Sequence, residues 1–370
     1  MKRRILVVIG TRPEAVKLAP LVRTLRAAPW AECRVLVTAQ HRELLDRTLQ
    51  FFGVVPDRDL DLMRPAQSPV DFTSRCLAAL DPVYAEERPD LVVVEGDTTT
   101  VFAAALGAFY RRVPVAHVEA GLRTCDRGTP FPEEANRRLV AQLADLHFAP
   151  TEIARRNLLR EGVADATVHV VGNTGIDALR WATVRVDAAQ FRPPPGRRLL
   201  LVTAHRRENL GAPLQGICDA VATLAERPDV AVLWPLHPHP GVRAAVEQRL
   251  GGREHVRLCG PLDYPDMVAA MQASHLLLSD SGGVQEEGPA LGRPVLVLRD
   301  ATERPEGIVA GVARLVGTDP RGIVAAVAGL LDDTAAYTAM ARVAYPYGTG
   351  GTAAAIAAVL GAGEPDGRTR

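Results

Sequence analysis

Cysteine is scarce in this sequence, and the cysteines present are not arranged in pairs. Five of them are scattered along 370 residues with no CxxC motif, at Cys33, Cys76, Cys125, Cys218 and Cys259. An odd, scattered set argues against both a disulfide framework and a cysteine-based zinc site. It indicates free thiols in a reducing compartment.

Long apolar runs and net charge are also missing. No apolar run reaches the roughly 20 residues that a membrane-spanning helix needs. The apolar run within Met1–Ile9 is interrupted by Gly10 and Pro13, so it predicts a first strand and not a signal peptide. We therefore expect a soluble, cytoplasmic protein without a membrane partner. Because 43 basic residues balance 43 acidic ones, broad nucleic-acid binding is not expected.

What the sequence does contain is a repeated alternation of short apolar runs with helical patterns. A length of 370 residues and 47% hydrophobic content suit two globular domains. In the helix expected after Pro13, Leu18, Leu21, Val22 and Leu25 fall on one face. Strands that alternate with helices predict a parallel sheet. The strands expected in the first half are Arg4–Ile9, Cys33–Thr38, Leu91–Glu95, Val113–Val118, Leu146–Ala149 and Val168–Val171.

A proline-rich break, Val184–Arg198, separates this half from a second alternation. We predict an α/β fold with a Rossmann-like domain at residues 1–184, a linker at 185–197, a second Rossmann-like domain at 198–350, and a C-terminal helix and tail at 351–370. Loops after the strands would line an interdomain cleft. The strands expected in the second half are Leu199–Thr203, Val230–Pro235, Val256–Cys259, His275–Ser279 and Pro294–Leu298.

Carboxylates gather after two strands of the first half. Asp97 follows Leu91–Glu95, and the stretch His117–Arg138 carries Glu119 and Glu133 among arginines. Neighbouring carboxylates raise one another's pKa, so that one can be protonated while another is ionised. Such a set suits removal of a proton and its later return. The alternatives are a solvated, ion-paired loop, and a helix cap at Asp97.

The segment DSGGVQEE predicts a phosphate cradle in the second half. A strand is followed by Ser281, Gly282 and Gly283 at a helix start, where free N–H groups and the helix dipole favour an anion. Glu287, one turn later, could accept hydrogen bonds from a ribose. The alternative is that Asp280 or Ser281 only caps the helix. Neither GxGxxG nor GxxxxGK[ST] is present, so no dinucleotide fingerprint or P-loop is predicted.

Two further groups have polar side chains suited to a phosphate. Arg12 and Lys17, in the segment GTRPEAVK, could bind one, although a surface ion pair with Glu14 is the alternative. His205 could steady charge on a leaving group. His237 and His239 have metal-ligand spacing, but no acidic residue follows closely, so we predict no metal site.

These motifs together resemble one family, the non-hydrolysing UDP-N-acetylglucosamine 2-epimerases of bacteria. The matching segments are GTRPEAVKLAPLV, TAQHRELLD, GDTTT, HVEAGLRT, PEEANRRL, VGNTGIDAL, HRREN, DSGGVQEE, GRPVLVLRDATERPE and VGTD. The resemblance implies a GT-B-type fold with the active site between two Rossmann-like domains. It implies interconversion of UDP-GlcNAc and UDP-ManNAc without a cofactor, through elimination of UDP to a 2-acetamidoglucal and its re-addition. A homodimer is also implied.

The resemblance assigns roles by motif. Asp97, Glu119 and Glu133 would be the acid/base groups, with His205 at the leaving phosphate. The groups that would bind the nucleotide are Arg12, Lys17, Arg137, Ser281, Gly282, Gly283 and Glu287. Positions matching an allosteric UDP-GlcNAc site are Gln40, His41, Glu43 and His237, with Glu43 replacing a frequent glutamine. Glu95 replaces a histidine common in the family.

Three other functions remain open at this point. A GT-B glycosyltransferase shares the two-domain plan but needs an acceptor. A hydrolysing epimerase would release free sugar and UDP. A nucleotide-sugar sensor would bind UDP-sugars without turnover.

Overall fold

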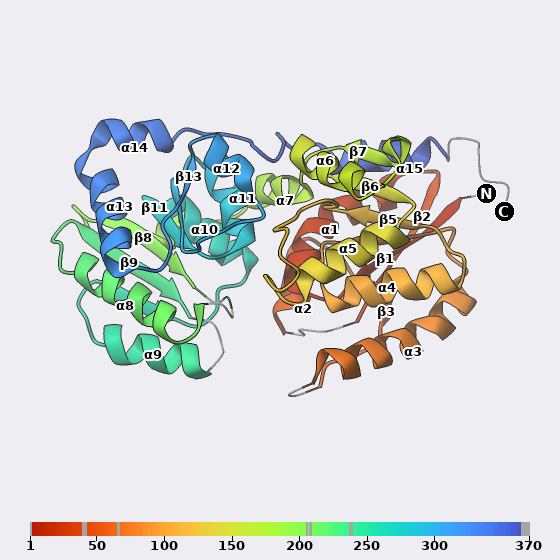
Figure 1. Cartoon of the computed structure of the whole chain (residues 1–370), viewed down its shortest axis with the longest axis horizontal. Helices are drawn as coiled ribbons and strands as arrows, with labels where there is room; N and C mark the ends of the chain where they lie inside the picture. The colour runs from red at the N-terminus through yellow and green to blue at the C-terminus, as the bar shows by residue number, and fades with distance from the viewer. Residues whose placement is uncertain are drawn as a thin grey trace. The chain divides into compact units, whose positions relative to one another are not determined.

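The computed structural model describes residues 2–38, 43–64, 67–204, 206, 209–236 and 240–363. It separates into two compact units (Figure 1). The first comprises residues 1–178 together with 347–370, and the second comprises residues 179–346. The chain therefore leaves the first unit once and returns to it at the end.

The first unit is built on a parallel sheet of seven strands in the order β3-β2-β1-β4-β5-β6-β7. Val, Ile and Leu dominate its central strands, as expected where both faces of a sheet are covered. The strands are β1 (Arg3–Ile9), β2 (Ala31–Val37), β3 (Arg58–Asp59), β4 (Leu91–Glu95), β5 (Val115–Val118), β6 (Leu146–Ala149) and β7 (Val168–Val170).

Helices cover both faces of this sheet (Figure 1). α3, α4 and α5 pack on the face formed by alternate residues such as Leu6, Val8 and Val94. α1 packs with α2 and α15, and its predicted face, including Leu18 and Leu25, is fully buried. The helices are α1 (Arg12–Ala27), α2 (Glu43–Phe51), α3 (Pro69–Glu87), α4 (Thr99–Tyr110), α5 (Glu133–Leu143), α6 (Glu152–Arg160), α7 (Thr174–Thr183) and α15 (Thr352–Gly361).

The second unit repeats the plan with a parallel sheet of six strands in the order β10-β9-β8-β11-β12-β13. Its core is formed between this sheet and α8, α9 and α13. The strands are β8 (Arg198–Thr203), β9 (Val230–Pro235), β10 (Val256–Cys259), β11 (Leu276–Ser279), β12 (Val295–Val297) and β13 (Ala313–Leu315). The helices are α8 (Ala212–Leu224), α9 (Pro240–Leu250), α10 (Tyr264–Ala273), α11 (Gly282–Ala290), α12 (Pro305–Val309), α13 (Pro320–Asp332) and α14 (Thr334–Met340).

Each sheet has a point where the order of the strands reverses. In the first sheet β1 and β4 are neighbours, and in the second β8 and β11 are neighbours. Connections from the two strands run to opposite sides there, which leaves a crevice at their carboxyl ends where α/β proteins bind ligands. The loops at these points carry Gly10–Thr11 and Gly96–Asp97 in the first unit and Asp280–Ser281 in the second.

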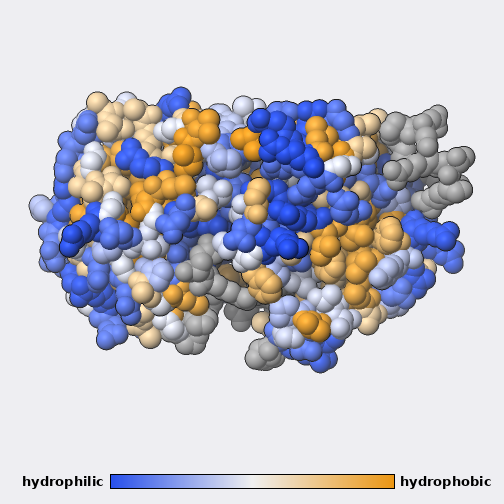
Figure 2. Space-filling model, viewed as in Figure 1, coloured by the Kyte–Doolittle hydropathy of each residue, from blue (hydrophilic) through white to orange (hydrophobic). Residues whose placement is uncertain are grey.

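The surface in Figure 2 mixes hydrophilic and hydrophobic side chains. An apolar patch lies over α4 and the adjoining α5, where Phe109, Tyr110 and Leu139 are exposed. Across the described ranges, no single helix is both long and apolar enough to cross a membrane; α13 and α14 reach that length and composition only as a pair, with a bend of 100° between them.

Candidate active site

A buried lysine lies between two carboxylates in the first unit. The Lys17 ammonium hydrogen-bonds Glu119 Oε2 and lies 3.5 Å from Glu95 Oε1. The three side chains are almost excluded from water, with exposures of 11% for Lys17, 7% for Glu119 and 3% for Glu95. The alternative of a surface ion pair between Lys17 and Glu14 is therefore wrong.

Local structure explains how these three groups meet. Lys17 lies in the second turn of α1, Glu95 is the last residue of β4, and Glu119 follows the last residue of β5. Glu119 has a positive φ of 62°, a conformation that is strained for a residue with a side chain and that is often found at functional sites. The neighbouring ends of β4 and β5 thus place both carboxylates near the start of α1.

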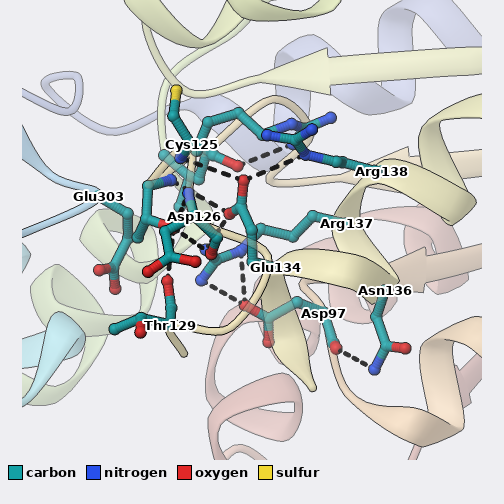
Figure 3. A network of polar contacts seen from close by, with 12 residues as sticks. Asp97, Cys125, Asp126, Thr129, Glu134, Asn136, Arg137, Arg138 and Glu303 are labelled. Carbon is teal, nitrogen blue, oxygen red and sulfur yellow. Dashed lines mark hydrogen bonds and ion pairs between the residues drawn. The ribbon is translucent and has the colours of Figure 1, made fainter. Parts of the chain in front are cut away.

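Asp97 is held by an arginine from α5 (Figure 3). Arg137 places Nε 2.8 Å and Nη2 2.6 Å from Asp97 Oδ2, and its Nη1 donates to Glu134 Oε2 at 3.0 Å. The helix cap of α4 is Thr98, whose hydroxyl accepts from the Val101 N–H, so the alternative of Asp97 as a cap is wrong. The Asp97 side chain remains 24% exposed.

Glu134, on α5, forms hydrogen bonds with the loop between β5 and α5 (Figure 3). It is fully buried and accepts hydrogen bonds from the backbone N–H groups of Thr124 and Cys125, at 3.1 and 3.3 Å. The loop between β5 and α5 is therefore anchored by a carboxylate that Arg137 in turn holds by a hydrogen bond. Glu133, the neighbouring acid/base candidate, is the first residue of α5 and is half-buried.

A further buried carboxyl, Glu14, connects the loops that follow β1 and β4. It accepts hydrogen bonds from the Gly10 N–H at 2.6 Å, the Thr11 hydroxyl at 2.9 Å and the Thr98 hydroxyl at 2.7 Å. Burial raises the pKa of Glu14 to about 7 despite these hydrogen bonds, and the charge of Asp97 adds to the rise. Glu14 was the alternative ion-pair partner expected for Arg12. Because it is buried within the loops, it does not form a surface ion pair.

Burial also raises the pKa of Glu95 well above its ordinary value, while Lys17 opposes the rise and Glu119, Glu14 and Asp97 add to it. The first unit therefore gathers four carboxyl groups near its switch point, and burial raises the pKa of two of them, Glu14 and Glu95. Such a set can hold a proton on one group while another is ionised, which is what acid/base chemistry requires.

The predicted phosphate cradle of the second unit begins α11. Ser281 precedes the first residue of the helix and makes no side-chain capping bond, so the alternative that it serves only as a cap loses support. At Gly282 a Cβ atom would lie 2.5 Å from Cζ of Arg304, so any other residue there would have to displace that guanidinium. Arg304 is itself held by Glu286 at 2.5 Å and by Glu303.

Glu287 points to a tyrosine and not to bulk solvent. The Tyr264 hydroxyl donates to Glu287 Oε1 at 2.9 Å, and both residues are buried. Asp280, just before the cradle, accepts hydrogen bonds at Oδ2 from the Arg206 backbone N–H and from Asn209 Nδ2, both at 2.9 Å. The loop after β8 is thereby joined to the cradle after β11.

Several predicted site residues lie outside the described residues. These are His205, Gln40, His41 and His237, together with the side chain of Glu43. Their roles remain predictions. Within the ranges that the structure describes, no group of three or more His, Cys, Asp or Glu side chains could hold a metal ion.

Sequence reasoning missed other members of the two sites. Asn173, which directly precedes α7, donates from Nδ2 to Glu119 Oε2 at 2.8 Å. Glu14, Tyr264 and Arg304 were likewise not predicted as site residues. Glu14, Asn173 and Arg304 belong to segments that carry the family resemblance. A charged or amide residue within such a segment was therefore the sequence feature that could have marked them as site residues.

Comparison with known proteins identifies the family. The family model described as UDP-N-acetylglucosamine 2-epimerase matches residues 23–361. The UDP-N-acetylglucosamine 2-epimerase of Escherichia coli O157:H7 is 50% identical over 358 residues, covering 94% of this chain and 95% of that protein. The enzyme of the same name from Bacillus subtilis is 46% identical, covering 94% and 92%.

Comparison with solved structures leads to the same family. The UDP-GlcNAc 2-epimerase of Neisseria meningitidis bound to UDP-GlcNAc is 42% identical and superposes with a TM-score of 0.93, covering 96% of this chain and 99% of that one. The glycotransferase of kitacinnamycin, only 16% identical with a TM-score of 0.63 and coverages of 97% and 98%, shares the fold. With a family model matched over most of its length and about half of its positions shared with full-length relatives, the chain belongs to the UDP-N-acetylglucosamine 2-epimerase family.

Proposed function

We propose that this protein interconverts UDP-GlcNAc and UDP-ManNAc by eliminating UDP and adding it back. The observation that carries the proposal is the buried group of Lys17, Glu95 and Glu119 at the switch point of the first unit. Relatives whose structures contain UDP-GlcNAc, or UDP-GlcNAc and UDP, support the choice of ligand.

The reaction needs a base, a bound leaving group and an acid. A carboxylate takes the proton from C2, and the C1–O bond breaks with its electron pair going to the β-phosphate of UDP. The product is a 2-acetamidoglucal. Return of a proton to the opposite face of C2, with UDP re-forming its bond at C1, gives the other epimer. Atoms and charge balance without a redox partner.

The residues divide between these tasks. Asp97, Glu119 and Glu133 are the acid/base candidates. Ser281, Gly282 and Gly283 offer the start of α11 to the diphosphate, where the helix dipole stabilises charge on the departing UDP. Glu287 is assigned to the ribose, and His205 to the leaving phosphate. The groups assigned to the nucleotide and its phosphates are Arg12, Lys17 and Arg137.

A time course by proton NMR tests this function. Protein incubated with UDP-GlcNAc alone should produce UDP-ManNAc until the two epimers reach a constant ratio, and UDP-ManNAc should give the same ratio from the other side. Free sugar accumulating with UDP would indicate a hydrolysing enzyme instead. Release of UDP only with an added acceptor would indicate a glycosyltransferase, and binding without any product would indicate a sensor.

A further inference from the structure

Glu119 Oε2 accepts hydrogen bonds from two segments that lie far apart in the sequence. One comes from the Lys17 ammonium on α1, and the other from Asn173 Nδ2 at 2.8 Å. Asn173 is almost completely buried, at 3% exposure. Donors that meet a carboxylate in a site with little water favour its ionised form.

The orientation of the Asn173 amide is fixed by its neighbours. Its Oδ1 accepts the Gly175 N–H at 2.7 Å, and its own backbone N–H donates to the Tyr347 carbonyl at 2.8 Å. An amide oxygen cannot donate, so the group that faces Glu119 has to be the NH₂. Asn173 therefore always presents a donor to this carboxylate.

Glu95 acts on Glu119 through the lysine that they share. One ammonium group lies between two buried carboxyl groups, so it cannot fully compensate both. When Glu95 is ionised, its negative charge draws the Lys17 ammonium away from Glu119 and repels the charge on Glu119. Glu95 thus favours the protonated form of Glu119, while Asn173 favours the ionised form.

We propose that Glu95 and Asn173 are positioning residues that set, in opposite directions, how readily Glu119 takes up a proton during the reaction. The proposal rests on the proposed function, because it concerns the same acid/base step. It explains why a neutral amide and a second carboxyl are buried beside one candidate base.

Other charges around this pair come from three elements. Lys17 and Glu14 lie on α1, Glu95 ends β4, and Asp97 follows β4, where it is paired with Arg137 of α5. Lys17, Glu14, Asp97 and Arg137 are left unaltered when only Glu95 or Asn173 is substituted. Two substitutions of nearly equal shape therefore test the effect: Glu95→Gln removes a group that can carry a negative charge, and Asn173→Asp replaces an amide donor with a carboxyl group that accepts hydrogen bonds and can add a negative charge.

The first measurement is the dependence of kcat/KM on pH. The acidic limb reports ionisation of the base in the free enzyme. Glu95→Gln should move this limb to lower pH by about one unit, and Asn173→Asp should move it to higher pH by about one unit. As a matched control, Glu152→Gln, which changes an exposed side chain of α6, should leave the limb unmoved. A limb that stays in place in both variants, or moves in the same direction in both, overturns the proposal.

A second measurement separates this proposal from the proposed function. Carboxyl ¹³C NMR titration, with the Glu119 signal identified by its loss in Glu119→Gln, gives the pKa of Glu119 without any turnover. The same opposite shifts are expected there even if no epimer is formed. Should Asn173→Asp fail to fold, the Glu95→Gln titration decides alone: an unchanged Glu119 pKa overturns the proposal.

Discussion

Glu14 is a carboxyl group surrounded by hydrogen-bond donors and shielded from water. Its contacts with Gly10, Thr11 and Thr98 hold together the loops that follow two neighbouring strands. The same loops lead into the helices that carry Lys17 and follow Asp97. A residue that the sequence shows only as part of a short motif therefore fixes the frame in which the candidate acids lie.

The first prediction concerns Glu14 and stability. Its pKa is about 7 in the folded protein and 4.5 in the unfolded chain, so between these values only the folded state keeps the proton. Stability from this group is present below pH 4.5 and is lost as pH rises towards 7, by about 3 kcal/mol in total. Glu14→Gln should remove that loss, because its amide can donate to the threonine hydroxyls while its oxygen accepts from Gly10.

Hydrogen exchange of the β1 amides in both proteins provides the check, since it gives the free energy of unfolding of the first unit alone. The free energy of unfolding of Glu14→Gln should increase relative to that of the wild type as the pH is raised from 4.5 to 7.5. A difference that does not change with pH would mean that burial does not raise the pKa of Glu14 above its value in the unfolded chain.

At the scale of elements, the pattern of apolar runs was informative where strands lie in the centre of a sheet. All eleven expected strands are present, with ends that differ by no more than about two residues. β3 and β13 were not expected, because these short edge strands, Arg58–Asp59 and Ala313–Leu315, contain no long apolar run. Sequence also could not show that α15 packs on α1, since that contact joins the two ends of the chain.

The candidate sites were less predictable from the sequence than the strands. The start of α11 could be predicted, because two glycines shortly after a strand indicate a tight turn into a helix. Contacts such as Asn173 with Glu119 span 54 residues and depend on how β5 and the segment after β7 are placed in space. No spacing along the chain encodes them.

The second prediction concerns the start of α11. In Gly282→Ala the new methyl group would overlap the Arg304 guanidinium, whose bonds to Glu286 and Glu303 resist displacement. We expect UDP to bind about tenfold more weakly, equal to about 1.4 kcal/mol. Gly329→Ala in α13 is the control, because a Cβ there meets no atom; it should keep UDP affinity and add about 0.5–1 kcal/mol of stability. Equal titration curves for both variants by calorimetry would remove Gly282 from the nucleotide site.

At the scale of the whole molecule, the proposed chemistry is divided between two units of similar plan. The first contributes carboxyl groups and the second a phosphate cradle, each at the switch point of its own sheet. Loss of proton transfer and loss of nucleotide binding should therefore be separable by substitution. The homodimer and the allosteric UDP-GlcNAc site stay predictions from the family resemblance.

Deuterium incorporation at C2 of UDP-GlcNAc in D₂O, measured beside UDP affinity, tests the central claim most directly. Wild type should exchange the C2 proton, while Asp97→Asn, Glu119→Gln and Glu133→Gln should exchange it at least about 100-fold more slowly and bind UDP nearly as tightly. A folded wild type that binds UDP without any exchange, or carboxamide variants that exchange at the wild-type rate, would contradict the assignment of proton transfer to these acids.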